Sequence, residues 1–398
     1  MTRPIEGIKI VDLSGIIMGP YATRILADLG AEVIKVESPQ VDSMRTVKPS
    51  RHDNMAGTTL NLHANKKSIV LDLKKPEAID ICLKLAAGAD VFLHNMRPAA
   101  VARLGLGYAR VAAVNPDIIY CNAVGFGREG PYANKAAYDD VIQAASGVPS
   151  LFTRARGEPD YVPSALCDKV AGLTITYSIL AALLGRSLGR GGQEIEVPMF
   201  EASVAFNLIE HLCGFAFDPP LEEFGWKRVL AKERRPFKTK DGYACILPYS
   251  TENWDAFFRF IGREDLIGDS RFATHPLRVA NIGFLYGLIA AVAPRYTNEE
   301  WIRFCDDNSI PASPANDLAD LWEDPHLKAV NLLGYAEHPT EGRYRTVGLA
   351  TRFTKTPIDV HAPAPLPGQH TVDILKGLGL SAERIDQLMS SGAARLAG

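Results

Sequence analysis

The chain has 398 residues and a formal net charge of −3, and 47% of its residues are apolar against 22% charged. This balance is typical of a soluble globular protein and gives enough chain for about two domains. The chain has no excess of basic residues, so a nucleic-acid partner or an anionic membrane surface is not indicated.

The six cysteines are scattered without a CxxC pair, and the nine histidines form no HxxH or HExxH pattern. Neither a disulfide framework nor a metal site is predicted, and a reducing cytoplasm is the expected location. The N-terminus lacks the apolar core of a signal peptide. The most apolar helix, around 173–184, is short and interrupted by Thr174, Thr176 and Ser178. It is therefore predicted to be a buried helix, and no membrane association is expected.

The first forty residues predict a βαβ unit. Strands at 8–12 and 32–37 flank a helix at 21–29, which has Pro20 in its first turn and Gly30 at its C-terminal cap. Further strands are predicted at 68–73, 91–94, 118–122 and 194–198, and helices at 76–87, 138–146 and 169–184. The alternation predicts an α/β fold with a Rossmann-like open parallel sheet and helices on both faces.

The character of the chain changes near residue 217. Asp218-Pro-Pro220 and the charged run 227–235 indicate a linker, and a hairpin from Phe237 precedes helices that begin near Thr251 and Thr297. Two capped helices, near 372–378 and 382–389, end the chain. We predict a large α/β domain built from residues 1–216 and 316–398, interrupted at 217–315 by a linker and a smaller α+β domain.

The turn after the first strand is a candidate phosphate site. Its glycines, in Gly15-Ile-Ile-Met-Gly19-Pro20, precede a helix N-terminus. Glu37 at the end of the second strand is the kind of residue that binds the ribose in a dinucleotide-binding site. Such a site requires the pattern GxGxxG, which this turn lacks. A tight strand–helix turn without a ligand is the alternative.

Asp168 comes directly before a long apolar helix. An aspartate in this place is commonly an N-cap. The helix N–H groups favour an ionised carboxylate, and a fixed carboxylate can act as a nucleophile, so both roles are compatible. The neighbouring Cys167 is a rival nucleophile, although no local pattern supplies it with a histidine base, and a small buried side chain is the simpler interpretation.

A second group of candidates lies on both sides of the glycine-rich loop 125–131. Tyr138, Asp139 and Gln143 follow the loop at the start of a predicted helix, which the aspartate can cap. The cations Arg97, Arg103 and Lys135 lie in or beside loops. Singly they read as surface charges, but together they can bind the phosphates of a nucleotide tail.

Several ordered segments resemble the family III CoA-transferases, also known as the carnitine dehydratase and bile-acid-inducible protein family, which includes formyl-CoA transferase. The resemblance is carried by Gly7-Ile-Lys-Ile-Val-Asp-Leu-Ser-Gly15, Ala27-Asp-Leu-Gly-Ala-Glu-Val-Ile-Lys-Val-Glu37, Asn65-Lys-Lys-Ser-Ile-Val-Leu-Asp-Leu73, Arg103-Leu-Gly-Leu-Gly107, Gly189-Arg-Gly-Gly-Gln193 and Gly368-Gln-His-Thr371. It covers most of the large domain.

The resemblance implies an interlocked homodimer that uses acyl-CoA and a small carboxylic acid as substrates, with no tightly bound cofactor and no metal. It implies Asp168 as the catalytic residue, which carries the acyl group as a mixed anhydride and then CoA as a thioester. The positions that match the family's substrate and CoA contacts, or that line its site, are Ile17, Met18, Asn95, Met96, Arg103, Lys135, Tyr138, Asp139 and Met199.

Rival functions remain open at this point. An α-methylacyl-CoA racemase of the same fold has a histidine where this chain has Tyr138, and tyrosine is a poor base near neutral pH. A CoA-binding protein without catalysis is a second alternative. Ile17, where the oxalate-specific branch has glutamine, argues against oxalate. Arg45 and Lys48 are candidates to pair with a second carboxylate of a dicarboxylic acid, or are surface charges.

Overall fold

The computed structural model describes residues 2–358 and 361–396. It divides into two compact units. The first unit comprises Met1–Ser146, Val162–Phe206 and His326–Gly398, and the second comprises Gly147–Tyr161 and Asn207–Pro325. Both ends of the chain thus contribute to the first unit, while the domain limits at 217 and 315 stay a prediction.

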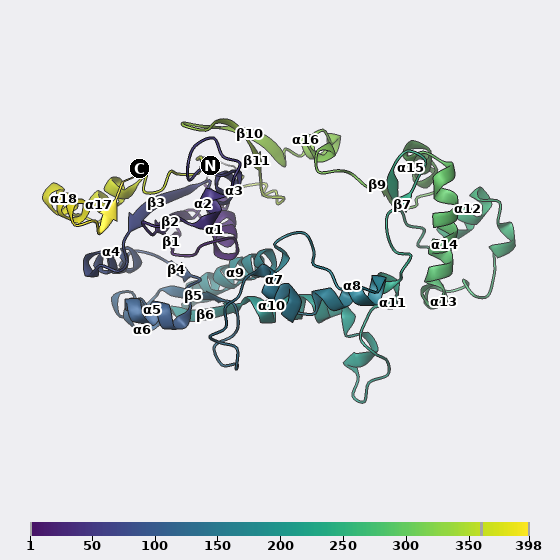
Figure 1. The fold of residues 1–398 in the computed structure, drawn as a ribbon, viewed down its shortest axis with the longest axis horizontal. Helices are drawn as coiled ribbons and strands as arrows, with labels where there is room; N and C mark the ends of the chain where they lie inside the picture. Colours follow the sequence, from purple (N-terminus) through teal and green to yellow (C-terminus); the bar gives the residue numbers. More distant parts are fainter. Residues whose placement is uncertain (1, 359–360, 397–398) are drawn as a thin grey trace. The chain divides into compact units, whose positions relative to one another are not determined.

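A seven-stranded, mostly parallel sheet forms the centre of the first unit (Figure 1). Its order is β12 (Ala394–Arg395), β3 (Lys66–Leu71), β2 (Glu32–Glu37), β1 (Lys9–Asp12), β4 (Val91–His94), β5 (Ile119–Val124) and β6 (Gln193–Pro198). Only β12 at the edge runs antiparallel, against β3. The predicted α/β fold with a large parallel sheet is confirmed, and the strand expected at 68–73 begins earlier, at Lys66.

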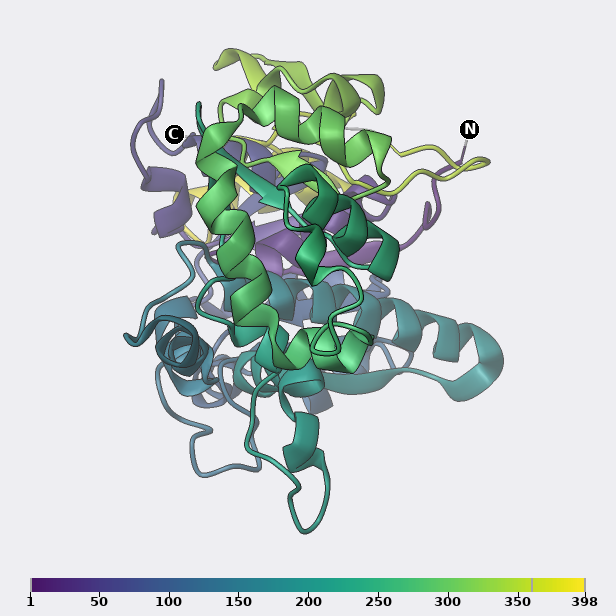
Figure 2. The ribbon, with the colours of Figure 1, turned by 90° about the vertical axis from the view of Figure 1, so that its right-hand side faces the viewer.

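Helices cover both faces of this sheet (Figure 1; Figure 2 gives the view turned by 90°). One face packs against α4 (Pro76–Ala87), α5 (Pro98–Leu104), α6 (Tyr108–Val114), α17 (Thr371–Gly377) and α18 (Ala382–Ser390). The other packs against α1 (Met18–Asp28), α7 (Asp139–Ala145) and α9 (Leu166–Gly185). Neighbouring strand residues alternate between the two cores, as Val11 and Ile10 do, because successive side chains leave opposite faces of a strand.

Helix α9 is longer than the predicted 169–184. It spans Leu166–Gly185 and continues as the π-helical turn η1 (Arg186–Arg190). By length and composition alone the stretch Leu166–Arg190 could cross a membrane, because the helix is longer than the sequence predicted. Half of its most apolar window is nevertheless buried, and the core helix of a folded protein passes the same test.

Shorter elements complete the first unit beside the sheet. They are α2 (Ser43–Thr46), α3 (Gly57–Leu62) and the antiparallel pair β10 (Leu333–His338) and β11 (Gly342–Val347). Two helices, α10 (Met199–His211) and α16 (Pro325–Ala329), cross between the units.

The second unit has its own aromatic core around Trp254, Phe257 and Trp301. Its strands β7 (Phe237–Lys238), β8 (Tyr243–Ile246) and β9 (Ala312–Pro314) form a small antiparallel sheet. Its helices are α8 (Val148–Arg156), α11 (Lys227–Leu230), α12 (Thr251–Phe260), α13 (His275–Ala280), α14 (Ile282–Val292) and α15 (Asn298–Asp307). The hairpin begins at Phe237, as predicted. The starts of α12 and α15 also lie where predicted, because capping boxes at Ser250 and Thr297 begin these helices.

Candidate active site

A cavity of about 240 Å³ lies in the first unit, beyond the carboxyl ends of β1, β4 and β5. Ligands of open parallel sheets bind at this edge, because the strand-to-helix loops gather there. The cavity brings together seven predicted site residues from distant parts of the sequence: Met18, Asn95, Met96, Lys135, Tyr138, Asp168 and Met199. Three predicted residues, Ile17, Arg103 and Asp139, do not line it.

Asp168 is the buried acidic group of the cavity wall, with 8% of its surface exposed. It is the third residue of α9, and the N-cap is Ala165, so the prediction of Asp168 as a capping residue was wrong. Burial, and next the charge of Asp139, raise the pKa of Asp168 to about 6, against the opposing effect of a hydrogen bond from the Met18 amide. The expectation that helix N–H groups dominate its ionisation is thus corrected, because desolvation outweighs them.

Asp139 does not line the cavity but contacts Asp168. Its Oδ1 accepts a hydrogen bond of 3.0 Å from the backbone amide of Asp168, and its Oδ2 accepts one of 2.6 Å from Gln143 Nε2. Gln143 is itself held by the backbone of the segment before α9, since its Oε1 accepts from the amide of Val162 at 2.9 Å. The Asp139 carboxylate is therefore held against the backbone at Asp168, in the first turn of α9.

The turn after β1 forms another wall, and two side chains clamp it. Asn95 exchanges two hydrogen bonds of 2.9 Å with the backbone of Gly15, and Asp42 Oδ2 accepts one of 2.8 Å from the amide of Ile16. Ile16 has a φ of 67°, a left-handed conformation that is unusual for a β-branched residue. Such strain persists only where surrounding bonds hold it. As a result Ile16 lines the cavity, whereas the predicted Ile17 serves as the N-cap of α1.

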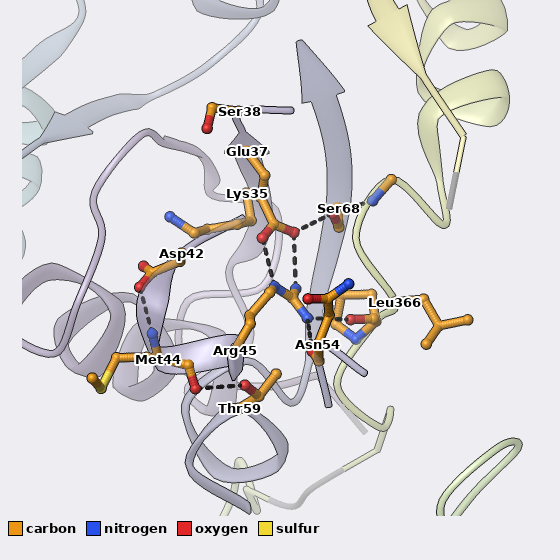
Figure 3. A network of polar contacts seen from close by, with 12 residues as sticks. Lys35, Glu37, Ser38, Asp42, Met44, Arg45, Asn54, Thr59, Ser68 and Leu366 are labelled. Carbon is orange, nitrogen blue, oxygen red and sulfur yellow. Dashed lines mark hydrogen bonds and ion pairs between the residues drawn. The ribbon is translucent and has the colours of Figure 1, made fainter. Parts of the chain in front are cut away.

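A buried ion pair supports the segment that carries Asp42 (Figure 3). Arg45 of α2 is fully buried, and its guanidinium binds Glu37 at the end of β2 through two bonds of 2.6 and 2.8 Å. Arg45 is therefore not available to a substrate carboxylate, and that candidate role was wrong. Lys48, the other candidate, is exposed and pairs with Asp53. Because Glu37 is bound to Arg45, it is not available to bind the ribose of a dinucleotide, which was the alternative considered for this turn.

Cations border the cavity on its exposed side. Lys135 and Arg97 line it, and the Lys135 ammonium lies 3.8 Å from the centre of the Tyr132 ring. Arg103 is exposed on α5, outside the cavity lining. Arg97 was recognised from the sequence only as one of several loop cations, because nothing in the sequence shows which of them faces the cavity.

Two further features bear on the chemistry. Burial raises the pKa of the Cys167 thiol, and Cys167 is only 1% exposed, so it suits a packing role better than that of a nucleophile. Within residues 2–358 and 361–396, no group of three or more His, Cys, Asp or Glu side chains could hold a metal ion.

Glycine is required where two segments of the wall approach each other. A Cβ at Gly19 would overlap the side chain of Ser14, and a Cβ at Gly125 would overlap that of Ala137. These contacts bring the start of α1 and the loop after β5 close to the cavity that holds Asp168.

Known proteins resemble this chain over nearly its whole length. The model of the family described as CoA-transferase family III matches residues 5–371. The human succinyl-CoA:glutarate CoA-transferase is 32% identical over 98% of this chain and 90% of its own length, and the Shigella sonnei formyl-CoA:oxalate CoA-transferase is 28% identical over 99% and 100%. A crystal structure of a CAIB/BAIF family protein from Brucella suis superposes with a TM-score of 0.80 at 28% identity, covering 95% of this chain and 100% of that one.

Proposed function

Because the chain belongs to CoA-transferase family III, whose members use CoA thioesters as substrates, we propose that it moves CoA from an acyl-CoA donor to a dicarboxylic acid through covalent intermediates on Asp168. The dicarboxylic class is suggested by the relatives, whose names specify succinyl, glutarate and oxalate substrates. The observation that carries the proposal is the buried carboxylate of Asp168 in the cavity wall.

The environment of Asp168 suits a nucleophile. A pKa of about 6 leaves the carboxylate mostly ionised at neutral pH. It also makes the carboxylate more basic than an ordinary aspartate, and basicity raises nucleophilic strength within one class of group. Burial removes the water that would otherwise solvate the attacking oxygen and hydrolyse an activated intermediate.

The proposed reaction consists of successive acyl transfers. A carboxylate oxygen of Asp168 attacks the thioester carbonyl carbon, a C–O bond forms, and the C–S bond breaks to release CoA thiolate. The thiolate then attacks the Asp168 carbonyl of this mixed anhydride, which expels the donor's carboxylate and leaves an aspartyl-CoA thioester. The acceptor carboxylate attacks that thioester, and the released thiolate takes the new acyl group, which regenerates Asp168. Together these steps replace one difficult exchange of CoA by several easier acyl transfers.

The other predicted residues receive proposed roles in binding. Met18, Asn95, Met96, Tyr138 and Met199 form walls around the acyl thioester, and Lys135 is suited to a CoA phosphate. Arg103, exposed on α5, is proposed to meet the nucleotide tail outside the cavity. Ile17 and Asp139 act indirectly, through the start of α1 and through Asp168.

We also propose that two copies form an interlocked homodimer. Helix α9 and its extension η1 expose Leu173, Tyr177, Leu184 and Leu188, which are 50–66% exposed and spaced along one helical face. A large apolar stripe on a surface favours coverage by a protein partner. A cytoplasmic location is proposed as well, consistent with the six cysteines of the described chain, all of which are free thiols.

A covalent adduct provides the test. The protein is incubated with succinyl-CoA, glutaryl-CoA and butyryl-CoA, treated with hydroxylamine, and analysed by intact mass and peptide mapping. We expect a modification on the Asp168 peptide that is absent from Asp168→Asn. Deuterium exchange at the α-carbon of a 2-methylacyl-CoA without any adduct would instead establish racemase chemistry and refute the transferase mechanism.

A further inference from the structure

Three buried charges lie against the turn that joins β1 to α1. Asp12 ends β1, while Lys35 and Lys66 come from β2 and β3, and the name "buried triad" is used below for these three residues. Each is at most 3% exposed. Both ammonium groups form ion pairs with the Asp12 carboxylate, at 3.8 Å from Lys35 and 3.6 Å from Lys66. The buried triad lies wholly within the first unit, as does Asp168.

The buried triad bonds the backbone at both ends of the turn. Lys35 donates to the Ser14 carbonyl, and Lys66 donates to the Pro20 carbonyl at 2.9 Å. Asp12 Oδ1 accepts a hydrogen bond of 2.8 Å from the Ser14 amide. The chain is therefore held just before the turn and again in the first turn of α1.

Met18 lies between these two anchored positions, as the first residue of α1. The first N–H groups of a helix have no acceptor within the helix, so the Met18 amide can donate to a group outside it. It donates to the Asp168 carboxylate. Burial and the charge of Asp139 raise the pKa of Asp168, and this hydrogen bond acts in the opposite direction.

Thr23 joins the buried triad to α1. Its hydroxyl is fully buried, donates to Asp12 Oδ2 at 2.6 Å and accepts from Lys66 at 2.7 Å. Burial lowers the pKa of Lys66 to about 7, so the charged form is costly in this place. Apolar residues of similar volume often fill a buried site without such a cost. The cost is explained if the bonds between the buried triad and the turn serve the site.

We propose that the buried triad positions the turn between β1 and α1 so that the Met18 amide stays bonded to the Asp168 carboxylate. Its three side chains act through the backbone and contact no reacting atom, so they are positioning residues. A donor that is already in place needs no rearrangement during the reaction, and its position therefore affects the rate. The inference rests on the proposed transferase function, which gives Asp168 its role as nucleophile.

Thr23→Val tests the proposal, because it removes the hydroxyl, nearly keeps the shape and changes no charge. Calorimetric Tm values of Asp168→Asn and its parent are compared in the wild-type and the Thr23→Val background. If the Met18 bond loosens, the pKa of Asp168 rises further, and the ionised carboxylate destabilises the folded state more at pH 7.5. The Tm gap at pH 7.5 should therefore be wider by about 2 °C in the Thr23→Val background, and it should be unchanged near pH 4.

Three further variants accompany this comparison. Thr23→Ser keeps the hydroxyl and should restore the wild-type gap. Thr371→Val removes another fully buried hydroxyl of the first unit, which donates to the Arg395 carbonyl, and should lower the Tm without widening the gap. Ser14→Ala removes the second hydroxyl donor to Asp12 without adding volume. It should also widen the gap, and it decides the matter if Thr23→Val does not fold.

Steady-state kinetics with the acyl-CoA that forms the adduct gives a second readout. In Thr23→Val, kcat should fall about tenfold while KM changes less than about twofold, and the acid limb should move to higher pH. Loss of the hydroxyl acceptor disfavours charged Lys66, whose titration would move to lower pH, so the direction separates the two groups. The charges of Asp139 and of Arg97 and Lys135, which line the cavity, are the same in the variant.

A Tm gap that stays the same in both Thr23→Val and Ser14→Ala would overturn the proposal. A raised KM with an unchanged kcat would assign the buried triad to CoA binding and overturn it too. Failure of the transferase function itself is seen separately, as the absence of an adduct on Asp168 in the wild-type protein. The Tm comparison needs no turnover and decides the positioning role in that case as well.

Discussion

Replacing Asp168 by asparagine should stabilise the folded protein at neutral pH while removing the proposed nucleophile. Burial and the charge of Asp139 raise the pKa of Asp168 from the ordinary 3.8 to about 6. A pKa difference of one corresponds to about 1.36 kcal/mol, so ionisation of this carboxylate costs the folded state about 3 kcal/mol. Asparagine has nearly the same shape and carries no charge, so the variant avoids that cost.

The sign of the pH dependence follows from the raised pKa. Asp168 ionises less readily in the folded state than in the unfolded state. Below the unfolded pKa of 3.8 the group is protonated in both states, and the wild-type protein keeps its full free energy of unfolding. This free energy falls as the pH rises through about 6. Calorimetric Tm values of Asp168→Asn and wild type should therefore agree best near pH 4. They should separate by about 5 °C by pH 7.5, with the variant more stable.

The matched control is Asp80→Asn, at an exposed aspartate of α4 in the same unit. Its Tm difference from wild type should stay nearly constant with pH. A Tm difference for Asp168→Asn that does not change between pH 4 and pH 7.5, or a variant that is less stable at pH 7.5, would refute the reasoning that burial and Asp139 oppose the charge of Asp168.

The two remaining predictions concern Asp139 and Arg45. Asp139→Asn should lower the pKa of Asp168, because it removes a like charge while its amide oxygen can still accept the Asp168 N–H. The acid limb of the acylation rate should then move from about pH 6 to lower pH in stopped-flow measurements, and an unmoved limb would contradict this. Arg45→Met should cost about 3–5 kcal/mol in urea unfolding, since it leaves Glu37 buried without its partner. Lys67→Met, at the exposed pair with Glu32, should cost less than about 1 kcal/mol, and equal losses would contradict the importance of burial.

Much of the first unit follows from local sequence patterns. The strand at 32–37, the helix at 76–87 and the strand at 91–94 have the limits that were predicted. Pro76 and Gly88 mark the two ends of α4, and apolar residues continue through the short strands because both faces of the sheet are covered. These signals depend on neighbours along the chain and need no knowledge of the fold.

Site residues were predicted less evenly. Asn95 and Met96 line the cavity, but they were identified through resemblance to a family, because each is an ordinary polar or apolar loop residue by itself. Lys135, which also lines it, was recognised from the sequence as one of several loop cations. Ile16 was missed, since no sequence signal indicates that a β-branched residue adopts a left-handed conformation. Asp42 was missed because its partner, the Ile16 amide, comes from a different turn.

The sequence by itself determined the order of strands and helices, the glycines at tight turns and the presence of an acidic residue at the start of α9. Only the tertiary structure decided what the charged groups do. It buried Arg45 against Glu37 and raised the pKa of Asp168. The physical reason is that secondary structure depends mainly on nearby residues, whereas desolvation and charge pairing depend on distant segments that meet only when the chain has folded.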